Sequence, residues 1–272
     1  MKRLFLILAA VSLVAISCNK EELNNVSKTR PVTLNVGIGA ETKVSHNYSD
    51  NKVKPAWEAG DVVYVQFEKE GTTHLEEFAI GTISEDGKSA SFSNSASELT
   101  DEIGYKVIYA TPDYTTVGDN SLTFNLAGQK GTLDKLPEYL EAEVAAGETS
   151  AALKSKLTYF HFVLSFNPYD YPGDYADLKD IQFGAIGRYN TFESGYFSLT
   201  NTGESVESIK IIPDFYINET LEFYVAAFQI EQAVRYSVNI CVDDDDFMHT
   251  WDANKNYVAG KVYKVEATLR KW

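Results

Sequence analysis

The sequence predicts an all-β protein, and three observations support this prediction. Apolar and polar side chains alternate at a period of two in segments along the whole chain, which indicates strands with one buried face. Aromatic residues make up 13% of the 272 residues, and Tyr and Phe are favoured on pleated sheets. Turn-forming residues separate the segments at short spacing, which is typical of a β-sandwich or a β-barrel.

The chain begins with the features of a secretory signal. Lys2 and Arg3 precede an apolar run over residues 4–16, which is shorter than the roughly 20 residues of a membrane-spanning helix. Residues 15–18, Ala-Ile-Ser-Cys, resemble a bacterial lipobox. This resemblance implies a signal peptide over 1–17 and a lipidated Cys18, held on a membrane by two or three acyl chains. The alternative is an ordinary signal peptide that happens to contain a cysteine.

The residues after Cys18 turn abruptly polar. The run Lys20-Glu21-Glu22 resembles the signal that sends lipoproteins of the Bacteroidetes to the outer face of the outer membrane. A solvated tether is the alternative, since charged residues form one readily. We expect residues 18–30 to be a lipidated tether on the cell surface.

Charge and cysteine content limit the partners and the source of stability. Residues 1–17 hold two of the 24 basic residues and none of the 39 acidic ones, so the remaining chain has a formal net charge of −17. This balance argues against nucleic acid and anionic lipid surfaces as partners. The second of the two cysteines is Cys241, so a lipidated Cys18 leaves no intrachain disulfide. Stability must therefore come from apolar burial.

Five segments alternate most clearly and are expected to be strands. They cover residues 32–38, 122–126, 160–166, 236–242 and 263–269. Turns are expected at 85–87, 112–113, 118–120 and 201–203, which are rich in Gly, Pro, Asp and Asn. The one helix-prone stretch runs from about Pro137 to Lys156, is rich in Ala and Glu, and is interrupted by Gly147. Because it lies near mid-chain, we place a domain boundary at about residue 150.

Motifs for catalysis or for metal binding are absent from the sequence, so we expect no enzyme activity and no cofactor. None of the four histidines has a His or Cys at metal-ligand spacing, and no Gly-x-Ser-x-Gly motif occurs. His161 lies opposite the Phe face of its strand and is expected to be structural. Cys241 is expected to be a half-buried, inert thiol. The run Asp243–Asp246 could bind calcium, but it lacks an interleaved glycine, which favours a solvated turn.

Four segments in order resemble elements of the fimbrillin family, the fimbrial subunit lipoproteins of the Bacteroidales. They are Trp-Glu-Ala-Gly-Asp at 57–61 with the strand 62–67, Leu-Ala-Gly-Gln at 126–129 with Gly-Thr-Leu at 131–133, the strand 159–165, and residues 257–263. The resemblance implies two tandem transthyretin-like β-sandwich domains, at 31–150 and 151–272. It implies a structural or adhesive fimbrial subunit, or an accessory or tip component. Other fimbrial subunits and host or bacterial surface ligands would be its partners.

The resemblance also implies assembly by strand exchange, in which a trypsin-like protease removes the first strand and a neighbouring strand replaces it. Lys43 is the matching processing position, where family members usually have arginine. The exchanged strand would carry Val32, Leu34, Val36 and Ile38 on one face. Burial of each contributes about 1.5–3 kcal/mol, or roughly 6–12 kcal/mol gross for the strand. The alternative is a core strand of a monomer that is never cut.

Two further hypotheses compete with a fimbrial role. A surface glycan-binding lipoprotein of a polysaccharide-uptake system would share the anchor, the β-architecture and the many tyrosines, whose rings can stack on sugars. A hydrolase built on a pair of the 39 carboxylates is the third hypothesis. The last expected strand ends near Trp272 with no further strand to donate. This favours a tip, accessory or uncleaved lipoprotein over a stalk subunit.

Overall fold

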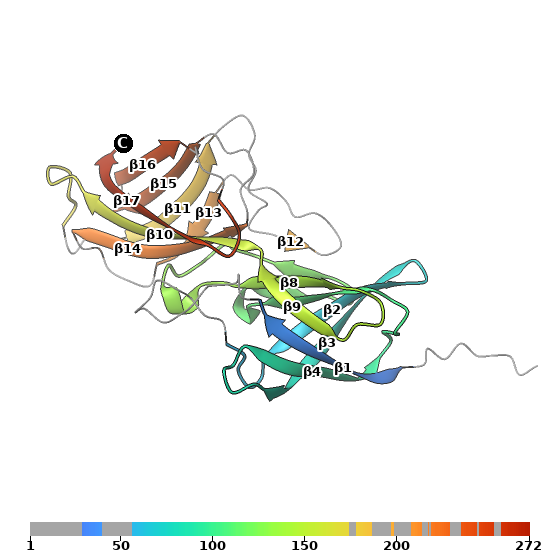
Figure 1. Ribbon diagram of the computed structural model, residues 1–272. Helices are drawn as coiled ribbons and strands as arrows, with labels where there is room; N and C mark the ends of the chain where they lie inside the picture. Colours follow the sequence, from blue (N-terminus) through green and yellow to red (C-terminus); the bar gives the residue numbers. More distant parts are fainter. Residues whose placement is uncertain are drawn as a thin grey trace, which may run out of the picture.

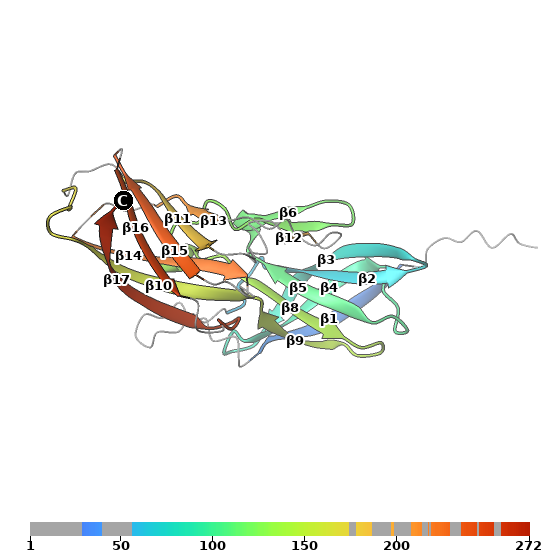
Figure 2. The ribbon, with the colours of Figure 1, turned by 90° about the horizontal axis from the view of Figure 1, so that it is seen from above.

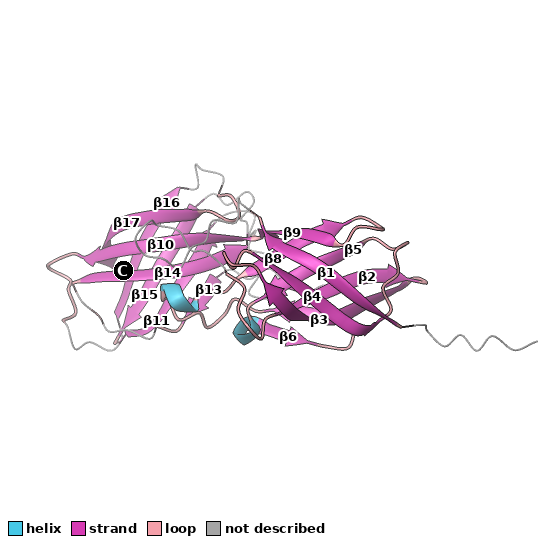
Figure 3. Ribbon diagram, turned by 60° about the horizontal axis from the view of Figure 1, so that its bottom comes forward, coloured by secondary structure: helices cyan, strands magenta, loops and turns pink. Residues whose placement is uncertain are grey.

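The computed structural model describes residues 29–39, 56–173, 178–186, 197–198, 208–213, 217, 219–228, 235–243, 245–252 and 257–272 (Figure 1). Over these ranges the chain is built of strands, with helical residues only in two 3₁₀ turns, η1 (Pro112–Tyr114) and η2 (Leu133–Lys135), which Figure 3 shows among the strands. The prediction of an all-β protein is therefore confirmed. No helix in these ranges is long and apolar enough to cross a membrane.

Seven strands of the N-terminal half close into a barrel. Their order around it is β1 (Arg30–Ile38), β4 (Ser89–Ser97), β3 (Thr72–Ile83), β2 (Val62–Lys69), β5 (Tyr105–Ala110), β8 (Tyr139–Val144) and β9 (Ser150–Ser155). Each strand alternates between the barrel interior and its surface, as in β9, where Ala151, Leu153 and Ser155 are buried and the residues between them are exposed. Closure leaves none of these seven strands at the end of a sheet.

Seven strands of the C-terminal half form one sheet that folds over on itself. Its order is β13 (Ser208–Ile211), β11 (Leu178–Ile186), β15 (Arg235–Val242), β16 (Asp245–Asp252), β17 (Val262–Lys271), β10 (Leu157–Phe166) and β14 (Thr220–Phe228). The sheet bends between β16 and β17, where the ladder consists of two residue pairs, Phe247–Lys271 and Met248–Arg270. The enclosed core is rich in aromatic rings, such as Phe160 and Phe183, whose centroids lie 4.7 Å apart.

The two halves are joined by a small sheet and by a common apolar core. A small sheet of β6 (Thr115–Val117), β7 (Leu122–Phe124) and β12 (Phe197–Ser198) joins them, because β12 of the C-terminal half pairs with β7. Figure 2 shows the halves end to end, with β6 and β12 beside the barrel. The larger apolar core runs through the junction, where Phe124 and Tyr139 contact Phe228 at centroid distances of 6.2 and 5.7 Å.

The five alternating segments all lie on strands, although β7 ends at Phe124. The helix-prone stretch from Pro137 to Lys156 forms no helix: it forms β8 and β9, joined by a turn in which Gly147 has φ +83°. Tertiary packing overrode the helix propensity of Ala and Glu, because each of these strands buries one face in the barrel.

The expected all-β class is correct, but the N-terminal half differs from the expected sandwich, because seven of its strands close a barrel. The chain passes from one sheet to the other at Lys156, between β9 and β10. The expected signal peptide, Cys18, Lys43 and the turn at 201–203 lie outside the described residues.

Candidate functional site

The first strand closes the barrel. On one side β1 pairs antiparallel with β4, from Arg30 opposite Ser97 to Gly37 opposite Ser89. On the other side it pairs in parallel with β9, and this ladder covers only 35–38 opposite 150–153. Parallel ladders are slightly less stable per residue than antiparallel ones. Of the two ladders that hold β1, the one with β9 is therefore the shorter and the weaker.

The apolar face of β1 is buried in the barrel. Val32, Leu34 and Val36 are 8%, 1% and 0% exposed, and Ile38 packs partly buried against the same core. The residues between them, Thr33 and Asn35, are exposed on the outer face of the barrel. The other six strands of the barrel, the segment before β2 and the loop after β4 all contribute to the core that these side chains enter. The other buried members of this core are Trp57, Val63, Val65, Phe67, Phe78, Ala90, Phe92, Leu99, Tyr105, Val107, Leu140, Val144, Ala151 and Leu153. Removal of β1 would open this core along its length.

The chain leaves β1 and returns to the barrel at one place. The backbone N–H of Ile38 donates to the carbonyl of Lys88, and the N–H of Trp57 donates to the carbonyl of Gly87, both at 2.8 Å. The Trp57 ring is buried edge-on against Phe92, with centroids 4.8 Å apart. Lys43 lies within residues 40–55. Ile38 on one side of this segment and Trp57 on the other are thus each held at the turn between β3 and β4 by a hydrogen bond of their own.

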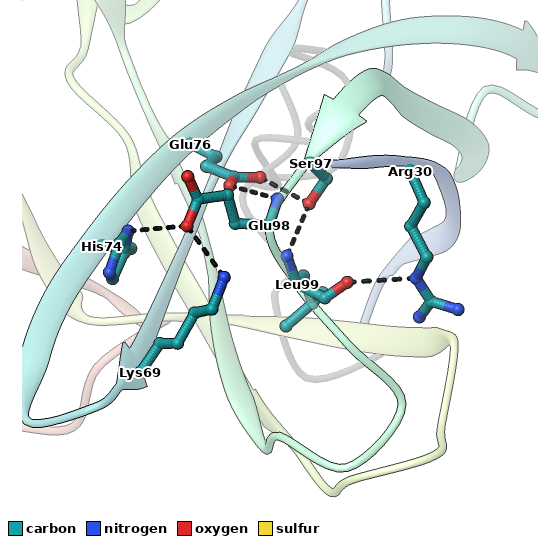
Figure 4. A network of polar contacts seen from close by, with 7 residues as sticks. All are labelled: Arg30, Lys69, His74, Glu76, Ser97, Glu98 and Leu99. Atoms are coloured by element: carbon teal, nitrogen blue, oxygen red, sulfur yellow. Dashed lines mark hydrogen bonds and ion pairs between the residues drawn. The ribbon is translucent and has the colours of Figure 1, made fainter. Parts of the chain in front are cut away.

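The start of β1 is held by Arg30. Its guanidinium donates through Nη1 and Nη2 to the two carboxylate oxygens of Asp101 at 3.0 and 2.6 Å. Through Nε it donates to the carbonyl of Leu99 at 3.2 Å (Figure 4). The hydrogen bonds and charge of Arg30 lower the pKa of the Asp101 carboxyl. A paired guanidinium and carboxylate of this geometry fixes orientation as well as distance. Arg30 therefore fixes where β1 begins on the barrel.

A polar bridge supports the segment that Arg30 binds. The ladder between β3 and β4 covers Ala79 to Ile83, and beyond it the Glu76 carboxylate joins the two strands. Glu76 accepts from the Ser97 hydroxyl at 2.5 Å and from the Glu98 N–H at 2.7 Å (Figure 4). Ser97 Oγ in turn accepts the N–H of Leu99 at 3.1 Å. These side-chain bonds replace backbone pairing and orient the Leu99 carbonyl toward Arg30.

The acidic side chain next to this bridge lies beside a lysine and a histidine. The Glu98 carboxylate lies 2.9 Å from Lys69 Nζ and 3.9 Å from His74 Nδ1, and the His74 ring stacks on Phe67 at 5.2 Å. Lys69 and Glu98 are both less than one third exposed. The arrangement holds the end of β2 to the residue that follows β4.

The other residues singled out from the sequence lie apart from β1. The His161 ring stacks on Tyr224 at 4.4 Å and Nε2 lies 2.8 Å from Glu222, which fits the structural role expected of it. Cys241 is half-buried, and burial together with Asp246 and Asp180 raises the pKa of its thiol. Asp245 binds Lys271 at 2.6 Å. In the described ranges no group of three or more His, Cys, Asp or Glu side chains could hold a metal.

Sequence reasoning missed the residues that hold the site together. Neither Arg30 nor Glu76 has a local signal in the sequence, because Asp101 lies 71 residues from Arg30 and the partners of Glu76 lie at and just after the end of β4. Gln129 was noted only within a motif, yet it is fully buried. Two glycines at 128 and 131, each with positive φ, flank it and could have marked a constrained turn.

Comparisons with known proteins find structures of one broad kind. No protein-family model matches the chain, and no curated protein matches it in sequence. A candidate cell adhesion protein from Bacteroides ovatus is 13% identical, with a TM-score of 0.49, over 90% of this chain and 96% of that one. The fimbrial anchor protein Mfa2 from Porphyromonas gingivalis is 12% identical, with a TM-score of 0.48, over 88% of this chain and 90% of that one.

A third structure belongs to the same kind. A fimbrial assembly protein from Parabacteroides distasonis is 14% identical, with a TM-score of 0.41, over 88% of this chain and 90% of that one. All three of these structures are less than 15% identical to the chain, and all three TM-scores are below 0.5.

Proposed function

We propose that this protein is a structural or adhesive component of bacterial fimbriae, either a subunit or an accessory or tip component. In this proposal Cys18 is lipidated, the protein reaches the cell outer membrane as a surface lipoprotein, and its units at 31–150 and 151–272 act as two tandem domains. Its partners are other fimbrial subunits and ligands on host or bacterial surfaces. The observation that carries the proposal is the position of β1, a barrel-closing strand that a single cut would separate from the rest of the chain.

A cut after Lys43 would remove the covalent connection between β1 and the barrel without releasing the chain that follows. Trp57 stays bound to the turn at Gly87 by its own hydrogen bond and by its buried ring. β1 would then be held by its two ladders, by Arg30 and by the burial of its apolar face. Burial of three side chains contributes about 5–9 kcal/mol gross, which an incoming strand of similar pattern can replace.

Loss of β1 would leave a groove with a strong preference for another strand. The facing edges of β4 and β9 would expose unpaired backbone groups, and the core around Leu153 and Phe92 would be open to water. Extended peptides add to such edges by backbone hydrogen bonds, and pockets for alternate side chains set the specificity. The sequence alternation of β1 is thus the pattern that a replacing strand would need.

The fate of the lipid follows from chain order. Cys18 precedes β1, so a cut at Lys43 would remove the anchor together with the strand. Without that cut, Cys18 remains the permanent attachment. The proposal therefore treats the lipid as a delivery device for a processed subunit and as an anchor for an unprocessed one.

A glycan-binding surface lipoprotein is the second candidate function. Two aromatic side chains favour it: Tyr169 is 96% exposed and Trp272 is 86% exposed. They follow β10 and β17, which are parallel and pair up to Phe166 and Leu269, so both lie beyond the same end of the sheet. Flat aromatic rings that face solvent can stack on sugars. Most other aromatic side chains in the described part of the C-terminal half, such as Tyr159 and Tyr236, are buried and serve packing.

Limited proteolysis of the purified, lipid-anchored full-length protein tests the proposal. A trypsin-like protease is expected to cut after Lys43, to release a lipidated fragment that contains β1, and to produce SDS-resistant oligomers that dissociate on heating. The variant K43Q is expected to stay intact and monomeric. K52Q is the matched control, since it removes a lysine from the same 40–55 segment and leaves Lys43. A protein that is cut as predicted but stays monomeric, or one that binds glycan as an intact monomer, would overturn the fimbrial proposal.

A further inference from the structure

The segment Leu126–Gly131 of the N-terminal half lies between the two end strands of the C-terminal sheet. These end strands are β13 and β14, and neither has a second strand beside it within the seven-stranded sheet. An end strand presents a row of backbone groups that need partners. The segment supplies partners to both strands at once, so it stands where an eighth strand would close the sheet.

Backbone hydrogen bonds connect the segment to both strands. On the β13 side, the N–H of Gly128 donates to the Lys210 carbonyl, and the N–H of Ile212 donates to the Gln129 carbonyl, each at 2.8 Å. Gln129 also forms a parallel bridge with Ile211. On the β14 side, the N–H of Tyr224 donates to the Gly131 carbonyl at 2.7 Å.

The Gln129 side chain completes the β14 side. Its Oε1 accepts the N–H of Ala226 at 2.8 Å, and its Nε2 donates to the carbonyl of Ala226 at 2.7 Å and to the carbonyl of Leu126 at 3.1 Å. Gln129 and Ala226 are both 0% exposed. A carboxamide carries the same donor and acceptor as a peptide unit, so it pairs with Ala226 as a neighbouring strand would.

Two glycines make this course of the backbone possible. Gly128 has φ +79° and Gly131 has φ +75°, a region that residues with a side chain rarely adopt. The turns that they form bring the Gln129 backbone to β13 and its side chain to β14. Leu126, just before them, is fully buried in the core shared by the two halves.

We infer that the C-terminal half is a strand-acceptor fold that the N-terminal half completes in cis, with Gln129 in the place of a strand's peptide unit. The gap between β13 and β14 takes a segment that pairs through its backbone on one side and through a side-chain amide on the other, and residues 126–131 of the same chain fill it. This segment is joined to β7 on one side and to β8 on the other, so a single cut does not release it. The groove of β1 is the one that a single cut at 40–55 can empty.

This inference goes beyond the proposed fimbrial function and does not depend on it, because none of these contacts involves β1. It is tested by amide hydrogen exchange on the intact full-length protein. In the wild type, the amides of Ala226 and Tyr224 on the end strand are expected to exchange as slowly as those in the middle of β10. Exchange of these amides as fast as that of exposed turn amides would overturn the inference without any mutation.

The variant Q129A sharpens the test. It is expected to speed exchange at Ala226 by at least about tenfold, because this buried N–H loses its acceptor and an unpaired buried donor has a penalty of that order. Exchange at Tyr224 and Ile212, whose N–H groups bond to backbone carbonyls of the segment, is expected to rise as well, because the segment loses its side-chain bonds to β14. Exchange in the β1–β4 ladder is expected to stay unchanged. Q182A, which removes a half-buried glutamine from β11, is the matched control and is expected to leave all of these amides protected. Unchanged exchange in Q129A, or equal acceleration in both halves, would overturn the inference.

Discussion

The guanidinium of Arg30 and the carboxylate of Asp101 form a two-point ion pair across 71 residues of sequence, with N–O distances of 3.0 and 2.6 Å. The pair connects the first residue of β1 to the loop after β4. It is solvent-exposed, so it positions the strand more than it stabilises the fold. Its effect is expected to depend on pH, because only the ionised carboxylate accepts both bonds.

The variant D101N tests this ion pair. The pKa of Asp101 is lowered from its ordinary value of 3.8 by Arg30, so its contribution to stability is present above that value and is lost as the pH falls through the lowered one. Urea unfolding is expected to show D101N less stable than the wild type at neutral pH. The difference is expected to shrink below pH 3.8. In an R30Q background D101N should have no further effect; an equal effect there would contradict the pairing.

The burial of Leu34 in β1 predicts a large effect of its truncation. Leu34 is 1% exposed, and L34A is expected to reduce the free energy of unfolding by about 2–5 kcal/mol, since it leaves a cavity in the barrel. Thr33, its neighbour on the outer face, is the matched control, and T33A is expected to change stability by about 0.5 kcal/mol or less. Denaturant unfolding measures both, and similar losses would contradict the assigned faces of β1.

The polar bridge of Glu76 is expected to contribute to barrel stability. The variant E76A leaves the Glu98 N–H and the Ser97 hydroxyl without their acceptor, which is expected to lower the free energy of unfolding by about 1–3 kcal/mol. The variant E77A removes the exposed neighbouring carboxylate and is expected to be close to neutral. Denaturant unfolding of the two variants checks the bridge, and equal stability would show that water replaces it.

The turn at Gly147 predicts a specific effect of a glycine substitution. With φ +83°, G147A is expected to lower the free energy of unfolding by about 1–2 kcal/mol, since a Cβ is unfavourable in that region. Gly37 provides the contrast: its φ is not positive, and a Cβ there would meet backbone atoms no closer than 3.8 Å. G37A is therefore expected to be neutral or to stabilise by about 0.4–1 kcal/mol, as thermal unfolding can measure.

Alternation along the sequence predicted the strands correctly, whereas the helix-prone composition of 137–156 did not predict the strands β8 and β9. Alternation along 32–38 directly reports which side chains of a strand are buried, and Val32, Leu34 and Val36 are buried as the pattern indicates. The composition of 137–156 reports only an intrinsic preference of about a few tenths of a kcal/mol per residue. Pairing of β8 with β5 and of β9 with β1 outweighs that preference.

The sequence by itself determined the all-β class and the buried face of β1, because both depend on neighbouring residues along one strand. Only the tertiary structure decided that β1 closes a barrel against β9, that Arg30 meets Asp101, and that Gln129 pairs with Ala226, 97 positions away. These contacts depend on strand order and register, which arise when distant segments bury their apolar faces together. A buried donor or acceptor must then bond to whatever that packing brings beside it, and no local pattern carries that information.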